Sequence, residues 1–226
     1  MSESVFASAC ARAPEGMEIS AVAAAQPGRI ALWSDQGTMS FAELNAQANR
    51  LVRRMRAAGL AAGDAVALVC SNRSEFAVVR FATHRAGLRL TPINWHLAPE
   101  DIRYIVENAE AKALFLDTRV AAVAPGCAQI PALRLRVAIG GELPDYTGWA
   151  DALDGMDGSD IPDPSLGGTM LYTSGTTGRP KGVFRPPLEP AHAAQLQQML
   201  TAVFQFDPES GTDRALATGP LYHTGP

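Results

Sequence analysis

Short apolar runs alternate with amphipathic stretches from Ser40 onward, and this alternation limits the chain to few folds. Ser40 and Glu43 form a capping box that begins a predicted helix, and Gly59 ends it. Parallel strands need a crossover, usually a helix, to return the chain to the same edge of a sheet. The pattern therefore predicts an α/β fold with doubly wound, mainly parallel sheets that helices cover on both faces. The predicted elements are strand 65–70, helix 75–86, strand 88–93, helix 99–109, strand 113–116 and strand 133–139.

The composition changes between residues 141 and 168, where Asp, Gly and Pro predominate. Few apolar side chains are available there for a core, so the stretch is predicted to be a surface linker. It separates an N-terminal α/β subdomain, residues 1–140, from a second region, residues 169–226. Alternating side chains predict that the strand at 133–139 is half exposed. In the second region the pattern predicts strands at 169–173, 181–185 and 214–218, and a helix within 190–206.

The overall composition is that of a globular protein and argues against several classes of function. The 226 residues are 47% hydrophobic and carry a net charge of −4, so the dense basic surface of a nucleic-acid-binding protein is not expected. No apolar run approaches the roughly 18 to 20 residues of a transmembrane helix, and the first ten residues do not resemble a signal peptide. Cys10, Cys70 and Cys127 show no metal or disulfide spacing, which favours reduced thiols in a cytoplasmic protein. The oligomeric state is left open, a dimer included.

A loop between two predicted strands concentrates hydroxyl groups, glycines and positive charge. Glycines bring backbone N–H groups close to a ligand and hydroxyls add donors, so the loop suits a polyphosphate. Its lysine is one of only two in a chain with 19 basic side chains. At about 4 Å from a phosphate oxygen it would contribute about 4 kcal/mol of attraction before desolvation costs. The residues are Thr173, Ser174, Gly175, Thr176, Thr177, Gly178, Arg179, Pro180, Lys181 and Gly182.

Two other interpretations of this loop are weaker. A flexible hairpin uses the same residue types, but this loop is longer than a two-residue turn and is followed by Pro-Lys-Gly. A Walker A loop places Gly-Lys-Ser/Thr at the start of a helix, whereas Lys181 and Gly182 lead into the β-prone Val183 and Phe184. A P-loop kinase or GTPase is therefore disfavoured.

The run from Leu171 to Gly182, LYTSGTTGRPKG, resembles the signature phosphate-binding motif of the adenylate-forming superfamily. That superfamily comprises acyl-CoA synthetases, nonribosomal peptide adenylation domains and luciferases. The run from Pro220 to Gly225, PLYHTG, resembles the next motif of the superfamily at a suitable separation. Residues 90–94 read LTPIN where peptide adenylation domains usually have YVPID, so the likeness is greater to acyl-CoA synthetases.

The resemblance implies roles for individual residues. Residues 173–178 and Lys181 would hold the β- and γ-phosphates of ATP. Tyr222 and His223 would lie beside the acyl pocket, with His223 orienting the substrate carboxylate. Lys181 and His223 are thus the catalytic candidates, and no residue is assigned to a metal. Residues 169–226 would then begin a nucleotide-binding region.

The resemblance also implies a reaction in two steps. A hydrophobic carboxylic acid attacks the α-phosphorus of MgATP to give an acyl-adenylate and pyrophosphate, and the thiol of CoA then displaces AMP. Because an anionic acid approaches a polyanionic triphosphate, Mg²⁺, Lys181 and the loop N–H groups must neutralise the leaving pyrophosphate. The expected small-molecule partners of the full-length parent are therefore a carboxylic acid, ATP with Mg²⁺, and CoA.

Superfamily members are much longer than this chain, which ends at Pro226 directly after the histidine motif. It has no Tyr-Gly-x-Thr-Glu element, so we expect an N-terminal fragment that is inactive alone. Two alternatives stay open: a non-catalytic nucleotide-binding or interaction module, and an amino-acid adenylation domain. A stop codon at this point in the gene favours the first, and a following carrier-protein module favours the second.

Replacement of the loop lysine tests the phosphate assignment. Lys181→Met in the intact parent removes the point charge and keeps most of the side-chain length, so we expect ATP turnover to be lost. Unaltered turnover in the variant, measured as AMP formation, would refute the assignment of both the loop and the enzyme type.

Overall fold

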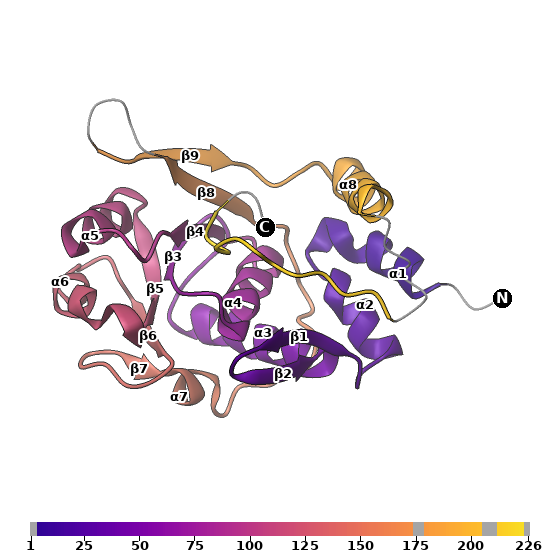
Figure 1. Ribbon diagram of the computed structural model, residues 1–226, viewed down its shortest axis with the longest axis horizontal. Coiled ribbons are helices and arrows are strands. Elements are labelled where there is room, and N and C mark those ends of the chain that lie inside the picture. The colour runs from indigo at the N-terminus through magenta and orange to yellow at the C-terminus, as the bar shows by residue number, and fades with distance from the viewer. Residues whose placement is uncertain (1–3, 174–178, 205–211, 224–226) are drawn as a thin grey trace.

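A single seven-stranded sheet forms the centre of the protein in a computed structural model that describes residues 4–173, 179–204 and 212–223 (Figure 1). The strands are β3 (Ala65–Val69), β4 (Arg89–Ile93), β5 (Ala111–Asp117), β6 (Leu135–Ile139), β7 (Thr147–Gly148), β8 (Gly168–Thr173) and β9 (Lys181–Arg185). Their order is β7-β6-β5-β3-β4-β8-β9. All neighbouring pairs are parallel except β8 and β9, which form an antiparallel hairpin.

Helices cover both faces of this sheet. One face carries α3 (Phe41–Ala57), α4 (Ser74–Arg85) and α7 (Trp149–Leu153), and the other carries α5 (Pro99–Asn108), the 3₁₀ helix η2 (Thr118–Val123) and α6 (Ala124–Ala128). In β3, Val66 and Leu68 belong to one buried cluster and Ala67 and Val69 to the other. Because successive strand side chains point to opposite faces, β3 is buried on both sides. The predicted doubly wound α/β fold is confirmed.

The helix predicted from the capping box is α3. Ser40 Oγ accepts a hydrogen bond from Glu43 N at 3.2 Å, and Ser40 N donates to Glu43 Oε2 at 2.7 Å. Both orphan donors at the start of the helix are thereby satisfied. Apolar residues at helical spacing, among them Leu44, Leu51 and Met55, are at most 1% exposed. The helix therefore packs its apolar stripe on the sheet as the sequence predicts.

Several elements lie where the pattern predicted none. They are α1 (Val5–Arg12), the 3₁₀ helix η1 (Ala13–Glu15), α2 (Glu18–Ala25) and the separate hairpin of β1 (Ile30–Ser34) with β2 (Gly37–Ser40).

The prediction of a strand at 214–218 is wrong, because residues 212–218 are described without strand pairing. The strand expected at 133–139 is β6, and its predicted half-exposure holds only in part. Arg134 is exposed and Arg136 partly exposed, but residues 137–139 are all buried because helices cover both faces of the sheet there. The helix expected within 190–206 is α8 (Pro190–Val203).

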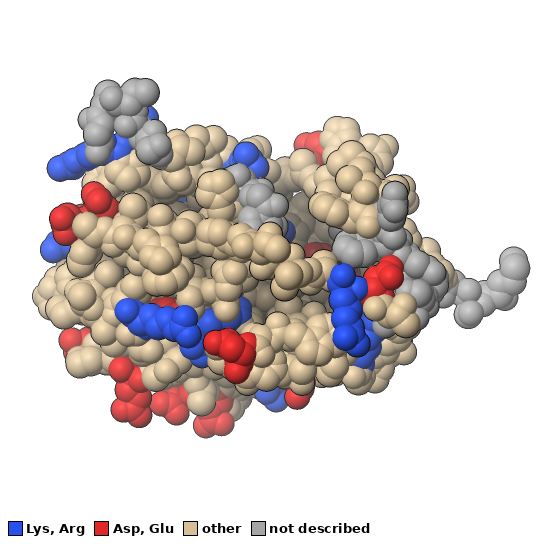
Figure 2. Space-filling model, viewed as in Figure 1, with Lys and Arg blue, Asp and Glu red and all other residues tan. Residues whose placement is uncertain are grey.

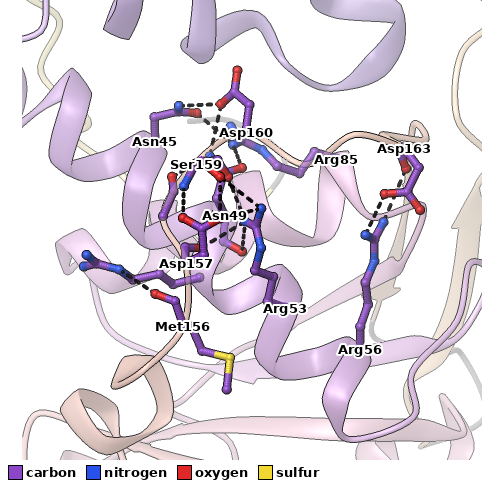
Figure 3. A network of polar contacts seen from close by, with 12 residues as sticks. Asn45, Asn49, Arg53, Arg56, Arg85, Met156, Asp157, Ser159, Asp160 and Asp163 are labelled. Atoms are coloured by element: carbon purple, nitrogen blue, oxygen red, sulfur yellow. Dashed lines mark hydrogen bonds and ion pairs between the residues drawn. The ribbon is translucent and has the colours of Figure 1, made fainter.

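The stretch from 141 to 168 is more ordered than the linker that its composition suggested. It contributes β7 and α7, and Ile161 and Ala152 are buried in the core. Residues 156–163 then run along α3, where polar side chains of that helix bind the chain (Figure 3). Hydrogen bonding thus replaces apolar packing here. The division of the chain into domains at this stretch stays a prediction.

Two asparagines of α3 connect the stretch to a buried arginine. The Arg85 guanidinium donates to Asn45 Oδ1 at 2.8 Å and to Asn49 Oδ1 at 2.6 Å, and the Asn49 amide donates to Gly158 O and Asp160 Oδ1 at 3.1 Å each (Figure 3). Burial lowers the pKa of Arg85 to about 10, so it remains charged at neutral pH. A buried charge needs such partners, which makes Asn49 the centre of this network.

Two further features can be compared with what the sequence predicts: the state of the cysteines and the length of the apolar helices. Cys10, Cys70 and Cys127 are free and buried, as expected of small apolar side chains. Burial raises the pKa of the Cys127 thiol to about 11. Within the described ranges no helix is long and apolar enough to cross a bilayer.

Asn49→Ala is expected to destabilise the protein by about 3 kcal/mol, because the variant leaves the buried Arg85 guanidinium and the Gly158 carbonyl without this partner. Arg56→Ala on the same helix is the matched control. It removes an ion pair with Asp163 whose side chains are 36% and 69% exposed, which is worth less than about 1 kcal/mol. Urea unfolding measures both values, and equal losses would contradict the role of the network.

Candidate functional site

The carboxyl ends of the parallel strands meet at one edge of the sheet, and the candidate residues lie along it. The connection from β3 to β4 runs through α4 on one face, and that from β4 to β5 runs through α5 on the other. In open α/β sheets, ligands bind outside such a point, where neighbouring connections leave in opposite directions. Asn72 follows β3, Asp117 ends β5 and Thr173 ends β8. The topology therefore brings three distant segments of the chain to the same edge.

The predicted phosphate loop joins β8 to β9. Thr173, the last residue of β8, pairs across the hairpin with Lys181, the first residue of β9, and both are exposed. Within the described ranges no carboxylate forms an ion pair with Lys181. An exposed ammonium group at this position can meet an anionic ligand. Ser174, Gly175, Thr176, Thr177 and Gly178 lie outside the described residues.

Both ends of the loop contact α5. The Tyr172 hydroxyl donates to Asn108 Oδ1 at 2.7 Å, and the Arg179 guanidinium lies 5.0 Å from the ring centroid of Tyr104. Burial raises the pKa of Tyr172 above its ordinary value, so its phenol is a donor at neutral pH. The sequence did not point to Tyr104 or Asn108, since a helix is needed to bring them under the loop.

The second motif lies across the carboxyl end of β3. The Asn72 amide donates to Gly219 O at 3.0 Å, and Leu221 N donates to Asn72 Oδ1 at 2.9 Å. Leu221 and Tyr222 are half-buried and pack against the core, whereas His223 is exposed. The surface where residues 212–223 cross the face in Figure 2 is formed largely by uncharged residues. The structure thus places Tyr222 and His223 on this edge, above β3.

A buried contact closes the edge beneath this segment. Ser71 Oγ donates to Asp117 Oδ2 at 2.7 Å, and Arg119 N donates to Asp117 Oδ1 at 2.9 Å. Asp117 is 1% exposed. It ties the ends of β3 and β5 together, so the floor under the site is rigid. Sequence reasoning missed Asn72 and Asp117, although a polar residue at or shortly after the end of a buried strand was the available signal.

The described residues hold no group of three or more His, Cys, Asp or Glu side chains that could bind a metal ion. The candidate residues offer electrostatic and hydrogen-bonding groups: an exposed lysine, a threonine hydroxyl, and a histidine near the end of β3. Such a set can bind and orient an anionic substrate.

The family model for the AMP-binding enzyme matches residues 19–225. The indoleacetate–CoA ligase of Aromatoleum aromaticum is 32% identical over 213 residues, which cover 88% of this chain and 39% of that ligase. Tyrocidine synthase 3 of Brevibacillus parabrevis is 31% identical over 164 residues, 71% of this chain and 2% of that protein. The crystal structure of ATP-bound MatB from Rhodopseudomonas palustris has a TM-score of 0.72 and is 29% identical, covering 94% of this chain and 41% of MatB. The chain thus spans less than two fifths of the length of that ligase.

Asn72→Ala is expected to release the segment of the second motif, because both of its hydrogen bonds to residues 219–221 are lost. Two such bonds correspond to about a tenfold faster amide exchange of this segment, measured by hydrogen–deuterium exchange. Asn94→Ala is the control. Asn94 follows β4 at the same edge, but it accepts a hydrogen bond only locally, from His96 N at 2.9 Å. Equal protection of residues 219–223 in both variants would contradict the role of Asn72.

Proposed function

The chain belongs to the AMP-binding enzyme family, and from that premise we propose that its parent protein is an AMP-forming acid–CoA ligase acting on a hydrophobic carboxylic acid. The observation that carries the proposal is the pairing of Thr173 with Lys181 at the two ends of a Ser/Thr/Gly loop. This pairing aims a hydroxyl and an ammonium group at the same space. The arrangement suits the phosphate chain of ATP, which needs neutralisation along its length.

The described residues fit a nucleotide better than a resident metal. Lys181 is exposed and meets no described carboxylate, so its charge is available to phosphate oxygens. Mg²⁺ is commonly held by substrate phosphates with one or two carboxylates. In this proposal Mg²⁺ arrives with ATP and is held mainly by its phosphate oxygens. Residues 173–178 and Lys181 are the proposed nucleotide-binding set.

The proposed chemistry assigns one task to each motif. Lys181 and the loop neutralise the charge that develops on the departing pyrophosphate, which lowers the barrier to attack at the α-phosphorus. His223 orients the acid carboxylate, and Tyr222 borders the acyl group. Asn72 contributes indirectly, because it fixes the backbone that carries both residues. The acyl-adenylate then passes to the CoA thiol with release of AMP.

The name of the indoleacetate–CoA ligase supports an acid with an apolar body. Apart from Asp213 and Arg214, the surface along residues 212–223 carries no Asp, Glu, Lys or Arg, which agrees with it (Figure 2). A second candidate is an amino-acid adenylation domain, because a peptide synthetase is 31% identical to this chain. In that case a carrier protein, not CoA, would accept the acyl group.

We also propose that residues 1–226 are inactive without the remainder of the parent. Every residue of β9 is exposed, and Val183 and Phe184 are 48% and 49% exposed although they are apolar. Apolar surface of this kind is usually covered in a functional protein.

The free, buried cysteines support a reducing compartment such as the cytoplasm.

Pyrophosphate release by the intact parent tests the proposed reaction. With ATP and Mg²⁺ we expect release that depends on an added aliphatic or aryl acid, followed by thioester formation only when CoA is present. Release with amino acids alone, without thioester formation from CoA, would support the adenylation domain instead. No acid-dependent release across the panel would refute both. Residues 1–226 alone should show no turnover.

A further inference from the structure

We propose that Tyr104 and Asn108 of α5 are positioning residues that hold the two ends of the phosphate loop, so that the affinity for ATP depends on them. The inference rests on the proposed function, since it concerns the same loop. It also assigns Arg179 a structural role in place of a phosphate contact. The juxtaposition that carries it is one helix face in contact with residues on both sides of the loop.

The two contacts come from opposite ends of the loop. Tyr172 precedes Thr173 in β8, and its hydroxyl donates to Asn108 Oδ1 at 2.7 Å. Arg179 stands two residues before Lys181, and its guanidinium lies over the Tyr104 ring, 5.0 Å from the centroid. Tyr104 and Asn108 are four residues apart, so they lie on the same side of the helix. A single face of α5 therefore receives both ends.

The helix is a firm support for these contacts. Ile102, Ile105 and Val106 of α5 are at most 1% exposed within the second core cluster. Tyr104 and Tyr172 both pack against that same cluster. The aromatic groups are thus held by the core on one side and by the loop ends on the other.

The hairpin of β8 and β9 needs this support because it pairs with the rest of the sheet only at the start of β8. The pairing of β4 with β8 ends at Leu90 and Thr169, so the last four residues of β8 extend beyond it. Its other neighbour, β9, is exposed along its whole length. In this part of the structure, contacts with α5 set the direction in which Thr173 and Lys181 point. Holding both ends in place lowers the entropy cost of binding a ligand between Thr173 and Lys181.

The residue that pairs with Tyr172 is Gly182, which has no side chain and leaves room for the tyrosine ring. Gly182 pairs with Tyr172 across the hairpin, and a Cβ at that position would lie 3.1 Å from Tyr172 Cζ and would collide with Met170. Glycine therefore leaves the tyrosine free to reach Asn108. This gives the glycine of the Pro-Lys-Gly run a physical reason that the loop itself does not supply.

The charges around Arg179 favour a structural role for it. It lines a cavity of about 260 Å³ together with three acidic residues of α5, Glu100, Asp101 and Glu107, and one basic residue, Arg103. A guanidinium over an aromatic ring is stabilised where it is. Lys181, which pairs with Thr173 across the hairpin, is then the cation that faces the phosphates.

Steady-state kinetics of the intact parent test the inference. Removal of a cation–π contact corresponds to about a three- to fivefold change in an equilibrium constant. We expect Tyr104→Leu and Arg179→Met each to raise KM for ATP by that factor, with kcat and KM for the acid changed less than about twofold. Tyr104→Phe keeps the ring and should match the wild type. The double variant Tyr104→Leu/Arg179→Met should be no worse than either single variant, because both remove one contact. Tyr172→Phe, which loses only the hydroxyl, should raise KM for ATP about threefold.

Several results would overturn the inference: an unchanged KM for ATP in Arg179→Met, additive effects in the double variant, or equal losses in Tyr104→Phe and Tyr104→Leu. If the parent shows no acid-dependent pyrophosphate release, the proposed function is refuted. The rate of trypsin cleavage then still tests whether α5 holds the ends of the loop. Trypsin does not cut at Arg179, which precedes Pro180, so cleavage between Lys181 and Gly182 reports local opening of the hairpin. It should be three- to fivefold faster in Tyr104→Leu and Arg179→Met, and unchanged in Tyr104→Phe. If Tyr104→Leu does not fold, as urea unfolding would show, Arg179→Met gives the answer because its side chain is exposed.

Discussion

The parallel sheet is buried on both faces, and the strand register and the placement of the candidate site follow from that burial. Apolar side chains of β3 enter both core clusters, so the sheet cannot shift in register without exposing one of them. All parallel strands then present their carboxyl ends at one edge. Asp117, buried and bonded to Ser71, ties the ends of β3 and β5 together there. Both motifs lie along that edge, although Lys181 and His223 are 42 positions apart in the sequence.

The loop between β8 and β9, the proposed phosphate loop, departs from this regular arrangement. It connects the only antiparallel neighbours in the described sheet, at the margin where packing is least complete. A hairpin at the edge of a sheet has few contacts to set its direction. Tyr172 and Arg179, on the two sides of the loop, each contact α5. In the proposed site, the hairpin thus supplies the charge of Lys181, and α5 supports the hairpin.

Polar contacts perform structural work elsewhere as well. Composition alone suggested that the acidic stretch at 156–163 is part of a linker. In the structure this stretch follows α3 and accepts hydrogen bonds from Asn49 and Arg53. Helices with a cap and an apolar stripe, such as α3, could be predicted because their determinants are local. The strand expected at 214–218 failed for the opposite reason: strands require a partner, and the pattern of a single segment does not say whether one is available.

The α/β class could be predicted from the sequence, and so could two motifs that resemble those of the adenylate-forming superfamily, because both depend on residue types at short spacing along the chain. The residues that contact these motifs could be identified only from the structure. Asn72 beneath the second motif, Asp117 in the floor, and Tyr104 with Asn108 under the loop act through contacts with segments far away in sequence. Such contacts follow from strand order and from which face a helix covers. Both are set by the packing of the whole core and are not encoded in any one segment.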